Sequence, residues 1–495
     1  MPSKSGAGVC FSEEYARLRP SVATTRESAI VEGDDADGLP EQVLQGIWYD
    51  QLFSEKEHST QEGHQLSILS PGWWNHQEGP DFRGAQIYFN GKLHSGDVEV
   101  HLDPADWKAH RHDIDERYDD VILHVVLEAH PGAVAITSKG RVIPTFVVGS
   151  RLTENIHTLS KRIQADELPY ATGQSPGRCA ELAAQGRQEI LRNLLMLAGE
   201  WRILNKARSL RERMEQVGGD QAIYEAFVYA CGFGHFKHHF KAIARHLPYE
   251  RVQQLARQDP LLLETAFLQI AGLLPDSLPE GTTAVPHFAR LRALRRDHLA
   301  GLRSLPLTWR RVGIRPANQP ERRLAGAARF LTRTADIGLM QSIDRIWVED
   351  CKPIDRRRHL ETLFPSAMGF WAEHCTWTGK KMASPSMPIG EGRIRSIIGN
   401  VFVPAALALA RRSRDRLKEE RVYALFQSLP KEPDNHIVHV MLPRIFGSQL
   451  PIRLDFIIQQ GLLQIHQDWC EANPSCHNCT MLRHLNAGEG NTATP

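Results

Sequence analysis

The stretch from Gly84 to Leu102, GAQIYFNGKLHSGDVEVHL, most limits which fold this chain can adopt. Apolar and polar residues alternate on both sides of Asn90-Gly91, and this period of two is that of β-strands. Asn-Gly is also the dipeptide that most favours a tight type I′ turn between antiparallel strands. The stretch therefore predicts a β-hairpin.

The segments on either side of the hairpin predict the rest of an α/β core. Residues 39–53 carry apolar side chains at helical spacing, and residues 65–75 begin with a short strand. After the hairpin, residues 103–118 open with Asp-Pro and predict a second helix. Residues 120–130 are a nearly continuous apolar run, which is typical of a buried central strand. The predicted order is helix, three strands, helix, strand.

Most of the remaining chain is predicted to be helical, which makes the fold class α+β or α/β. Residues 187–219 are amphipathic and end in Gly-Gly, as many helices do. We expect five parts: a disordered tail over 1–38, the α/β core over 39–150, a mostly helical domain over 151–460, a Cys-rich metal knuckle over 461–485 and a disordered tail over 486–495.

Composition argues against several classes of protein. The chain has 59 Lys+Arg and 58 Asp+Glu, so any surface that binds nucleic acid must be a local patch. The N-terminus lacks the apolar core of a signal peptide, and we expect no membrane-spanning segment. Eight cysteines in 495 residues are too few for a disulfide scaffold, which indicates a cytoplasmic protein. The sequence has no Walker A or Rossmann glycine pattern, which argues against P-loop NTPases and dehydrogenases.

Two carboxylates of the hairpin form a candidate metal site. Asp81 stands at the entry to the hairpin and Glu99 lies on its second strand, so folding can bring both to one strand end. Adjacent carboxylates make an oxygen-rich site that suits Mg²⁺ or Mn²⁺, with Zn²⁺ as the alternative. Such an ion neutralises phosphate charge and lowers the pKa of a bound water, which phosphodiester cleavage requires.

Further metal-capable side chains surround this pair, because the segment around the hairpin holds six histidines. Asp106 and His110 are four residues apart and would share one helix face, while His112 and Asp115 would share another. The candidate metal ligands are Asp81, Glu99, His101, His110, His112 and Asp115. The alternative is a structural polar network in which these groups satisfy one another. His124, alone in an apolar strand, is expected to be a satisfied core residue.

The element order and the positions of the acids resemble the core of the PD-(D/E)xK nucleases. This resemblance implies catalytic roles for Asp81 and Glu99, and for Glu41, which matches an acid that many members carry in the first helix. It fails at the third motif position, where His101 replaces the superfamily's lysine. His101 can act as a base or as a ligand, and Lys108 can supply a migrated ammonium. The remaining alternative is a site that binds nucleic acid without cleaving it.

Six motifs of the chain resemble the DUF2851 family of bacterial proteins. They are EGPDFRGAQI, GDVEVHLDPADW, DERYDDVILHVV, YACGFGHFKHHFKAIARHLP, RPANQPERRLA and the C-terminal cysteine cluster. The resemblance covers about residues 39–485. It implies a soluble bacterial protein and brings no known substrate.

The C-terminal cysteines form a second candidate metal site. Cys470, Cys476 and Cys479 are spaced C-x5-C-x2-C, and a C-x2-C pair on a tight turn can offer two thiolates to one ion. The segment resembles the iron–sulfur loop of helix-hairpin-helix DNA glycosylases, but the place of that loop's fourth cysteine is taken by leucine. His484 or His466 can complete a Cys₃His site, which favours structural zinc over an iron–sulfur cluster. The alternative is a set of free thiols.

Residues 290–325 are rich in arginine and include Trp309. A basic helix with an aromatic side chain can bind a phosphate backbone, whereas the simpler interpretation, which we prefer, is a solvated surface. Within the same segment, Arg315 and Asn318 are candidate substrate contacts.

The leading hypothesis is therefore a metal-dependent, nuclease-like phosphodiesterase that acts on nucleic acid. One alternative is a catalytically silent protein that binds nucleic acid or has a regulatory role. The other is a metal-dependent hydrolase of a different substrate, because the site has more histidines than a Mg²⁺ nuclease needs.

Overall fold

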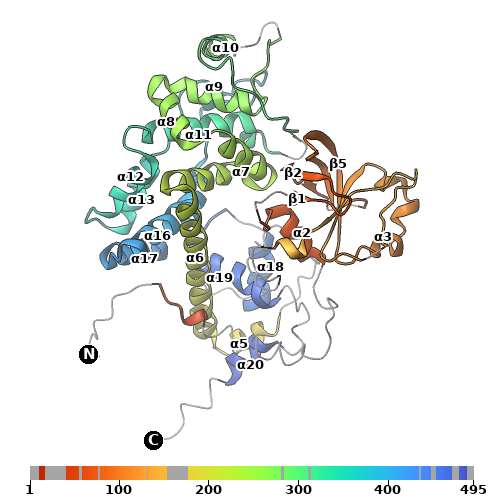
Figure 1. Cartoon of the computed structure of the whole chain (residues 1–495). Coiled ribbons are helices and arrows are strands. Elements are labelled where there is room, and N and C mark those ends of the chain that lie inside the picture. The colour runs from red at the N-terminus through yellow and green to blue at the C-terminus, as the bar shows by residue number, and fades with distance from the viewer. Residues whose placement is uncertain are drawn as a thin grey trace, which may run out of the picture. The chain divides into compact units, whose positions relative to one another are not determined.

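The computed structural model describes most of the chain as two compact units (Figure 1). The described residues are 11–16, 41–54, 58–75, 78–130, 132–152, 156, 177–279, 282, 284–309, 311, 314–433, 436–447, 453–470, 476 and 479–487. One unit comprises Met1–Tyr15, Arg192–Asp434 and Ile452–Gly461, and the other comprises Ala16–Leu191, Asn435–Pro451 and Leu462–Pro495. The tails predicted over 1–38 and 486–495 lie almost wholly outside the described residues.

An α/β core with one mixed sheet forms the N-terminal part of the second unit. Its elements are α2 (Glu41–Asp50), β1 (His58–Ser59), β2 (Gln65–Ser70), β3 (Trp73–Trp74), β4 (Phe82–Phe89), β5 (Lys92–His101), α3 (Asp106–Ala109), β6 (Val121–Val126) and β7 (Thr145–Val147). The strand order is β1-β2-β4-β5-β6-β7, with β3 paired to β4. The pairs β5–β6 and β6–β7 are parallel and the others are antiparallel.

The hairpin predicted at Asn90-Gly91 is confirmed. Strands β4 and β5 are antiparallel, and Phe89 pairs with Lys92, so the loop has two residues. Asn90 has a φ of 49° and Gly91 a φ of 78°, the left-handed backbone that a type I′ turn requires at both positions. The predicted order of helix, strands, helix and strand also holds, with β1, β3 and β7 as additional short strands.

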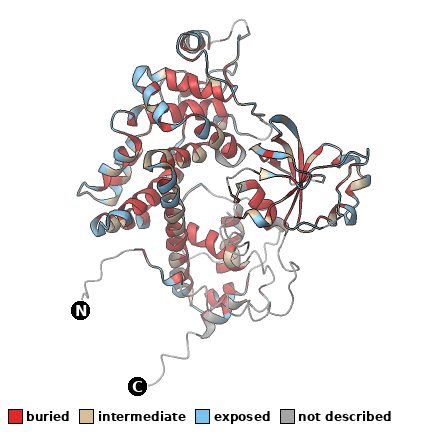
Figure 2. Ribbon diagram, viewed as in Figure 1, coloured by how far each residue is buried: buried red, intermediate tan, exposed pale blue. Residues whose placement is uncertain are grey.

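Helix α2 packs its apolar side chains against one face of the sheet. The cluster includes Ile47 and Trp48 of α2, Val98 and Val100 of β5, and Phe146 of β7, and all five are buried (Figure 2). Trp48 also donates its indole N–H to the Pro71 carbonyl at 3.1 Å, so its polar atom is satisfied. Burial of each such side chain contributes roughly 1.5–3 kcal/mol, and this packing fixes α2 against the sheet.

The second predicted helix, over 103–118, is wrong as a continuous helix. Only the four residues of α3 are α-helical, and two 3₁₀ turns follow, at His112–Ile114 and Glu116–Tyr118. Arg111 has a φ of 63°, and a left-handed residue cannot continue a right-handed helix. The break turns the chain between His110 and His112, so their positions do not follow helical spacing.

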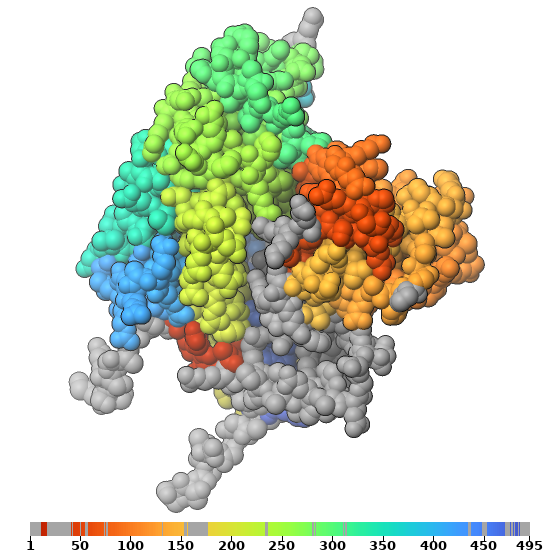
Figure 3. All heavy atoms as spheres, in the orientation of Figure 1, coloured from red at the N-terminus to blue at the C-terminus, as the bar shows by residue number. Residues whose placement is uncertain are grey.

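The rest of the described chain is mostly helical. Its helices are α5 (Cys179–Ala184), α6 (Gln188–Val217), α7 (Gly219–His246), α8 (Tyr249–Gln258), α9 (Pro260–Ile270), α10 (Val285–His298), α11 (Pro320–Thr334), α12 (Leu339–Asp344), α13 (Pro353–Thr362), α14 (Phe370–Glu373), α15 (Glu391–Ile397), α16 (Val403–Ser413), α17 (Arg416–Ser428), α18 (His436–Phe446), α19 (Phe456–Ile465) and α20 (Thr480–Ala487). The helix predicted over 187–219 is confirmed as α6, whose exposed side is yellow in Figure 3.

One helical stretch, Glu391–Ser413, is long and apolar enough to cross a membrane by length and composition. It joins α15 and α16 through a π-helical turn at Ile398–Phe402, just before Pro404, whose nitrogen cannot donate a hydrogen bond. In its most apolar window, 78% of the residues are buried inside the protein. Buried core helices of soluble proteins meet the same criteria, so the stretch is weak support for a membrane span.

Candidate metal centre in the α/β core

The strand register places three polar side chains on one face of the sheet. Glu99 of β5 pairs with His124 of β6, and His101 follows Glu99 by two residues on the same strand. Because side chains alternate along a strand, Val98 and Val100 point to the opposite face, where α2 packs. Glu99, His101 and His124 are all at most 5% exposed. Polar groups buried this deeply require partners.

Asp81 and Glu99 lie together at the end of the hairpin, as the sequence predicts. The Asp81 backbone N–H donates to Glu99 Oε2 at 2.9 Å, and the Val100 N–H donates to Asp81 Oδ2 at 3.1 Å. From α2, the Gln45 amide donates to Asp81 Oδ1 at 2.8 Å and to Glu41 Oε1 at 3.2 Å. A single hydrogen-bonded group therefore includes three carboxylates from a helix, a loop and a strand.

Three histidines meet these carboxylates. The ligand atoms of His101, His110 and His112 lie within 4.8 Å of one another. Glu99 Oε1 is 3.5 Å from His101 Nε2 and 3.3 Å from His112 Nε2. On the other side of the His101 ring, Nδ1 lies 2.9 Å from His124 Nε2, within hydrogen-bonding distance. His124 is thus a support for His101 and not an isolated core residue.

Burial shifts the acid–base behaviour of these groups in opposite directions. It raises the pKa of Glu99 to about 8, and it raises that of Asp81, which Glu99 and Glu41 raise further. Burial lowers the pKa of His101 to about 2 and that of His124 to about 3. The His101 and His124 rings are therefore neutral near pH 7, and His101 keeps the lone pair that metal binding requires.

His112 provides a direct test of whether these residues fit a cation. It is 7% exposed and stacks on Tyr118 with a centroid separation of 3.7 Å. Among the described residues, neither of its ring nitrogens has a hydrogen-bond partner of acceptable geometry. An unsatisfied buried imidazole beside a carboxylate is costly, and a shared cation removes that cost. The mixed oxygen and nitrogen donors fit Mn²⁺ or Zn²⁺ better than Mg²⁺.

Over residues 41–435 the chain matches the family model described as "Protein of unknown function (DUF2851)". The chain is a member of the DUF2851 family. No curated protein and no solved structure matches it.

Two of the predicted site residues of this DUF2851 chain take other positions. Asp115 caps the second 3₁₀ turn and binds the Arg117 side chain at 2.6–3.0 Å, so its carboxylate is already paired. Lys108 is exposed on α3, and no described contact joins it to either carboxylate of the hairpin. The cluster that the structure assembles comprises Glu41, Asp81, Glu99, His101, His110 and His112.

Of the two predicted substrate contacts, Asn318 lies in a pocket of about 430 Å³ and Arg315 is exposed. Asn318 accepts a hydrogen bond from Arg323, and Arg322 binds the backbone carbonyls of Trp371 and Ser386. Neither buried guanidinium has a carboxylate partner among the described residues, and burial lowers the pKa of Arg323 to about 10. The lining of this pocket in the helical unit therefore combines two buried guanidinium groups with the carboxylate of Glu391.

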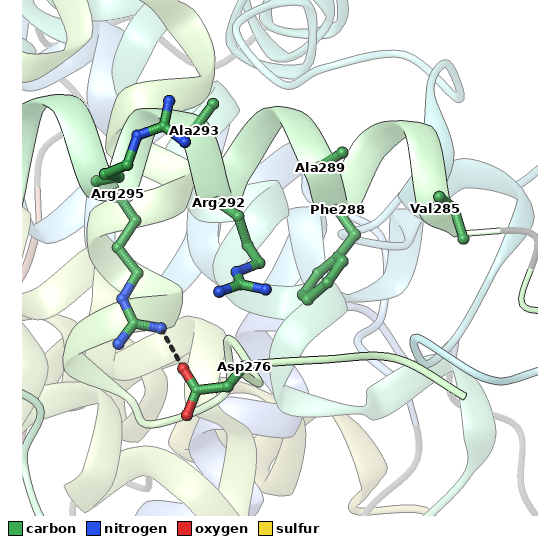
Figure 4. A pocket seen from close by; sticks show the side chains of 8 residues that line it. Asp276, Val285, Phe288, Ala289, Arg292, Ala293 and Arg295 are labelled. Carbon is green, nitrogen blue, oxygen red and sulfur yellow. Dashed lines mark hydrogen bonds and ion pairs between the residues drawn. The ribbon is translucent and has the colours of Figure 1, made fainter. Parts of the chain in front are cut away.

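Four arginines of the arginine-rich segment pair with acids, namely Arg290 with Asp259, Arg295 with Asp276, Arg296 with Asp297 and Arg311 with Glu321. Arg295 of α10 pairs with Asp276 at 3.1 Å beside Arg292 in a second, open pocket of about 600 Å³ (Figure 4). Trp309 is not free for stacking on a base, because it donates to the Ala271 carbonyl at 2.8 Å and packs near Phe236. The contacts match those of an ordinary solvated helix surface.

Two residues of the site were missed by sequence reasoning. Gln45 follows Glu41 by four residues, and this spacing alone could have placed it on the face that meets Asp81. The role of His124 depends on its register with Glu99 on a parallel strand, which a single sequence does not reveal. In the other unit, Glu349, Cys351 and His359 also bring their ligand atoms within 4.8 Å of one another, but this group is largely exposed and His359 is paired with Glu349.

Proposed function

We propose that the α/β core is a divalent-metal-dependent hydrolase that cleaves phosphodiester bonds in nucleic acid. The observation that carries the proposal is the convergence of Asp81 and Glu99 with His101, His110 and His112 on one rim. The element order supports it, since a helix, an antiparallel hairpin and a following parallel strand resemble the PD-(D/E)xK core.

The residues that would hold the ion are Asp81, Glu99 and the three imidazoles. When bound, the ion would supply a water of lowered pKa and would neutralise phosphate charge. The chain's own contribution is orientation. Gln45 and the Val100 N–H fix the Asp81 carboxylate, and His124 fixes the His101 ring.

The open side of the cluster is marked by its more accessible members. His110 is exposed, and Asp81 and Glu41 are partly buried, whereas Glu99, His101 and His112 are buried. Exposed cationic side chains, Lys108 and Arg111, lie next to His110 in the chain. A phosphate can thus approach His110 near positive charge while the inner ligands stay fixed.

A second candidate, binding without cleavage, is favoured by one specific observation. The position that carries lysine in active nucleases is here His101, which is fully buried and neutral, because burial lowers its pKa to about 2. It therefore provides no positive charge to polarise an attacking water. The two candidates agree on metal binding and differ only in turnover.

The test is a metal-dependent nuclease assay on the purified full chain. Single- and double-stranded DNA and RNA would be incubated with Mg²⁺, Mn²⁺ or Zn²⁺, and with EDTA as the metal-free arm. We expect cleavage with Mn²⁺ or Zn²⁺ that EDTA abolishes and that Asp81→Asn removes. His94→Ala is the matched control, because His94 is exposed near the start of β5.

Three outcomes separate the candidates. Cleavage that survives in Asp81→Asn would refute the assigned roles. Metal-dependent binding that weakens steeply with salt, without any cleavage, would select the binding protein. Turnover of a non-nucleotide ester or amide with the same metal and variant dependence would keep the site and replace the substrate class.

A further inference from the structure

Four thiols from distant parts of the chain lie together in the second unit. Cys470 ends the π-helical turn His466–Cys470, and Cys476 and Cys479 precede α20. Cys179 begins α5, far earlier in the sequence, and helices α5 and α18 pack against each other. A Cβ built on Gly177 would lie 3.4 Å from Cys476 Sγ, so the segment leading into α5 contacts the C-terminal cysteines directly.

Two of the four thiols are buried, and Cys470 and Cys479 are partly buried. Cys179 is 7% and Cys476 is 9% exposed. Cys470, Cys479 and Cys476 each interact electrostatically with the Cys179 thiol, so all three lie near it.

The guanidinium group of Arg444 lies beside the sulfur atoms. Arg444 of α18 donates Nη2–H to Cys476 Sγ at 3.2 Å, and its guanidinium also forms a hydrogen bond with the Cys470 side chain. The Gly177 N–H donates to the Arg444 carbonyl at 2.9 Å, which ties the Cys179 segment to the same residue. Arg444 therefore connects the segments that carry Cys179, Cys470 and Cys476.

The spacing of the sulfur atoms distinguishes two kinds of centre. Among the described residues, no three of these thiols have their sulfur atoms within 4.8 Å of one another. A single tetrahedral zinc with bonds of about 2.3 Å holds its four sulfurs about 3.8 Å apart. A cluster in which each cysteine binds a different iron spreads its ligands more widely.

We propose that Cys179, Cys470, Cys476 and Cys479 ligate a [4Fe–4S] cluster. The C-terminal segment has only three cysteines, and Cys179 provides the fourth ligand. His466 is buried near Arg444, and the side chain of His484 lies outside the described residues. The four ligands lie in α5, in the turn His466–Cys470 and just before α20, so the role of the cluster is to fix the C-terminal segment.

The test is the metal content of the full chain purified without oxygen. We expect about four irons and four acid-labile sulfides per chain, with visible absorption that bleaches on reduction. Cys179→Ser should lower the bound iron at least as much as Cys476→Ser does. Cys375→Ser is the matched control, because Cys375 is partly buried, lies in the other unit and contacts Met382.

Each contrary result overturns a defined part of the proposal. One zinc per chain without sulfide would replace the cluster with a zinc site, and full iron in Cys179→Ser would remove Cys179 as a ligand. If the chain binds neither iron nor zinc after anaerobic reconstitution with iron and sulfide, the metal site is refuted. If a variant fails to fold, X-ray absorption at the iron edge of the wild-type protein decides, since each iron is expected to have only sulfur ligands, with the other irons of the cluster as the next neighbours. Each readout is independent of hydrolytic activity.

Discussion

The two polar clusters of this chain differ in the atoms they offer and in their access to solvent. The core cluster offers oxygen and nitrogen, and its member His110 is exposed. The thiol cluster offers sulfur, two of its cysteines are less than 10% exposed, and a guanidinium lies beside it. Catalytic metal sites keep an accessible position, whereas structural sites are closed by protein ligands. The core cluster thus has the features of a reactive site and the thiol cluster those of a structural one.

The two clusters also differ in what holds their ligands in place. In the core, Gln45 and His124 orient ligands that already belong to a stable sheet packed against α2. At the thiols, the ligands themselves join segments that are far apart in the sequence, and the described helices there are as short as the six residues of α5. Damage to the first cluster should therefore affect chemistry, and damage to the second should affect stability.

The largest expected effect is on activity in Glu99→Gln. Glu99 contacts the Asp81 backbone and lies within 3.5 Å of both His101 and His112, so its loss removes the centre of the cluster. We expect hydrolysis to fall by more than about 100-fold, beyond the loss typical of outer-shell changes. The unfolding temperature should change little, because the glutamine keeps an acceptor for the Asp81 N–H.

The matched control for this variant is Glu128→Gln, at an exposed position just after β6. It should keep wild-type activity. Equal losses in both variants, measured as kcat/KM with Mn²⁺, would show that the core cluster is not the reactive site.

The next effect concerns stability in Cys179→Ala. Binding free energy at a site that exists only in the folded chain counts as folding free energy. Loss of about 3 kcal/mol would lower the unfolding transition of a unit of this size by roughly 6–12 °C. Scanning calorimetry measures the shift, and titration with Mn²⁺ measures the core site separately. A variant with unchanged unfolding temperature would contradict the structural role, and one with lost Mn²⁺ affinity would show that the clusters are not separate.

A smaller effect is expected from His124→Phe. The phenyl ring preserves packing against Trp107, whose centroid lies 5.2 Å from that of His124, but it removes the partner of His101 Nδ1. Loss of an outer-shell partner weakens metal binding by roughly 10- to 100-fold. Isothermal titration with Mn²⁺ and Zn²⁺ measures it. If the metal affinity is unchanged, His124 does not orient the His101 ring for metal binding.

Local patterns in the sequence were sufficient to predict the core fold and its acids. Alternation with Asn90-Gly91 located the hairpin, and the hairpin brings Asp81 to Glu99. Side chains with period two then place Glu99 and His101 on one face. These features depend on short-range geometry, which a sequence carries directly.

Features that depend on long-range contacts or backbone strain could not be predicted. The helix expected over 103–118 ends at Arg111 because that residue is left-handed, and nothing in its side chain signals this. Cys179 is separated from the other thiols by most of the chain, so only folding shows that they are neighbours. The resemblance to a local iron–sulfur loop directed attention to nearby histidines instead.

The smallest expected effect is on metal affinity in Gln45→Leu, and this variant tests most directly whether the two clusters are independent. Gln45 binds Asp81 and Glu41 but is not itself a ligand, and leucine keeps its size in the buried face of α2. Loss of a hydrogen bond to a charged group costs about 1.5 kcal/mol, which corresponds to about tenfold in metal affinity. Gln61→Leu, at an exposed position, is the control.

The iron content of Gln45→Leu should equal that of the wild type, because no described contact of Gln45 reaches a thiol. A tenfold loss at the core with unchanged iron would establish that the two sites are held by separate networks, whereas a parallel loss of iron would show that one polar framework orders both.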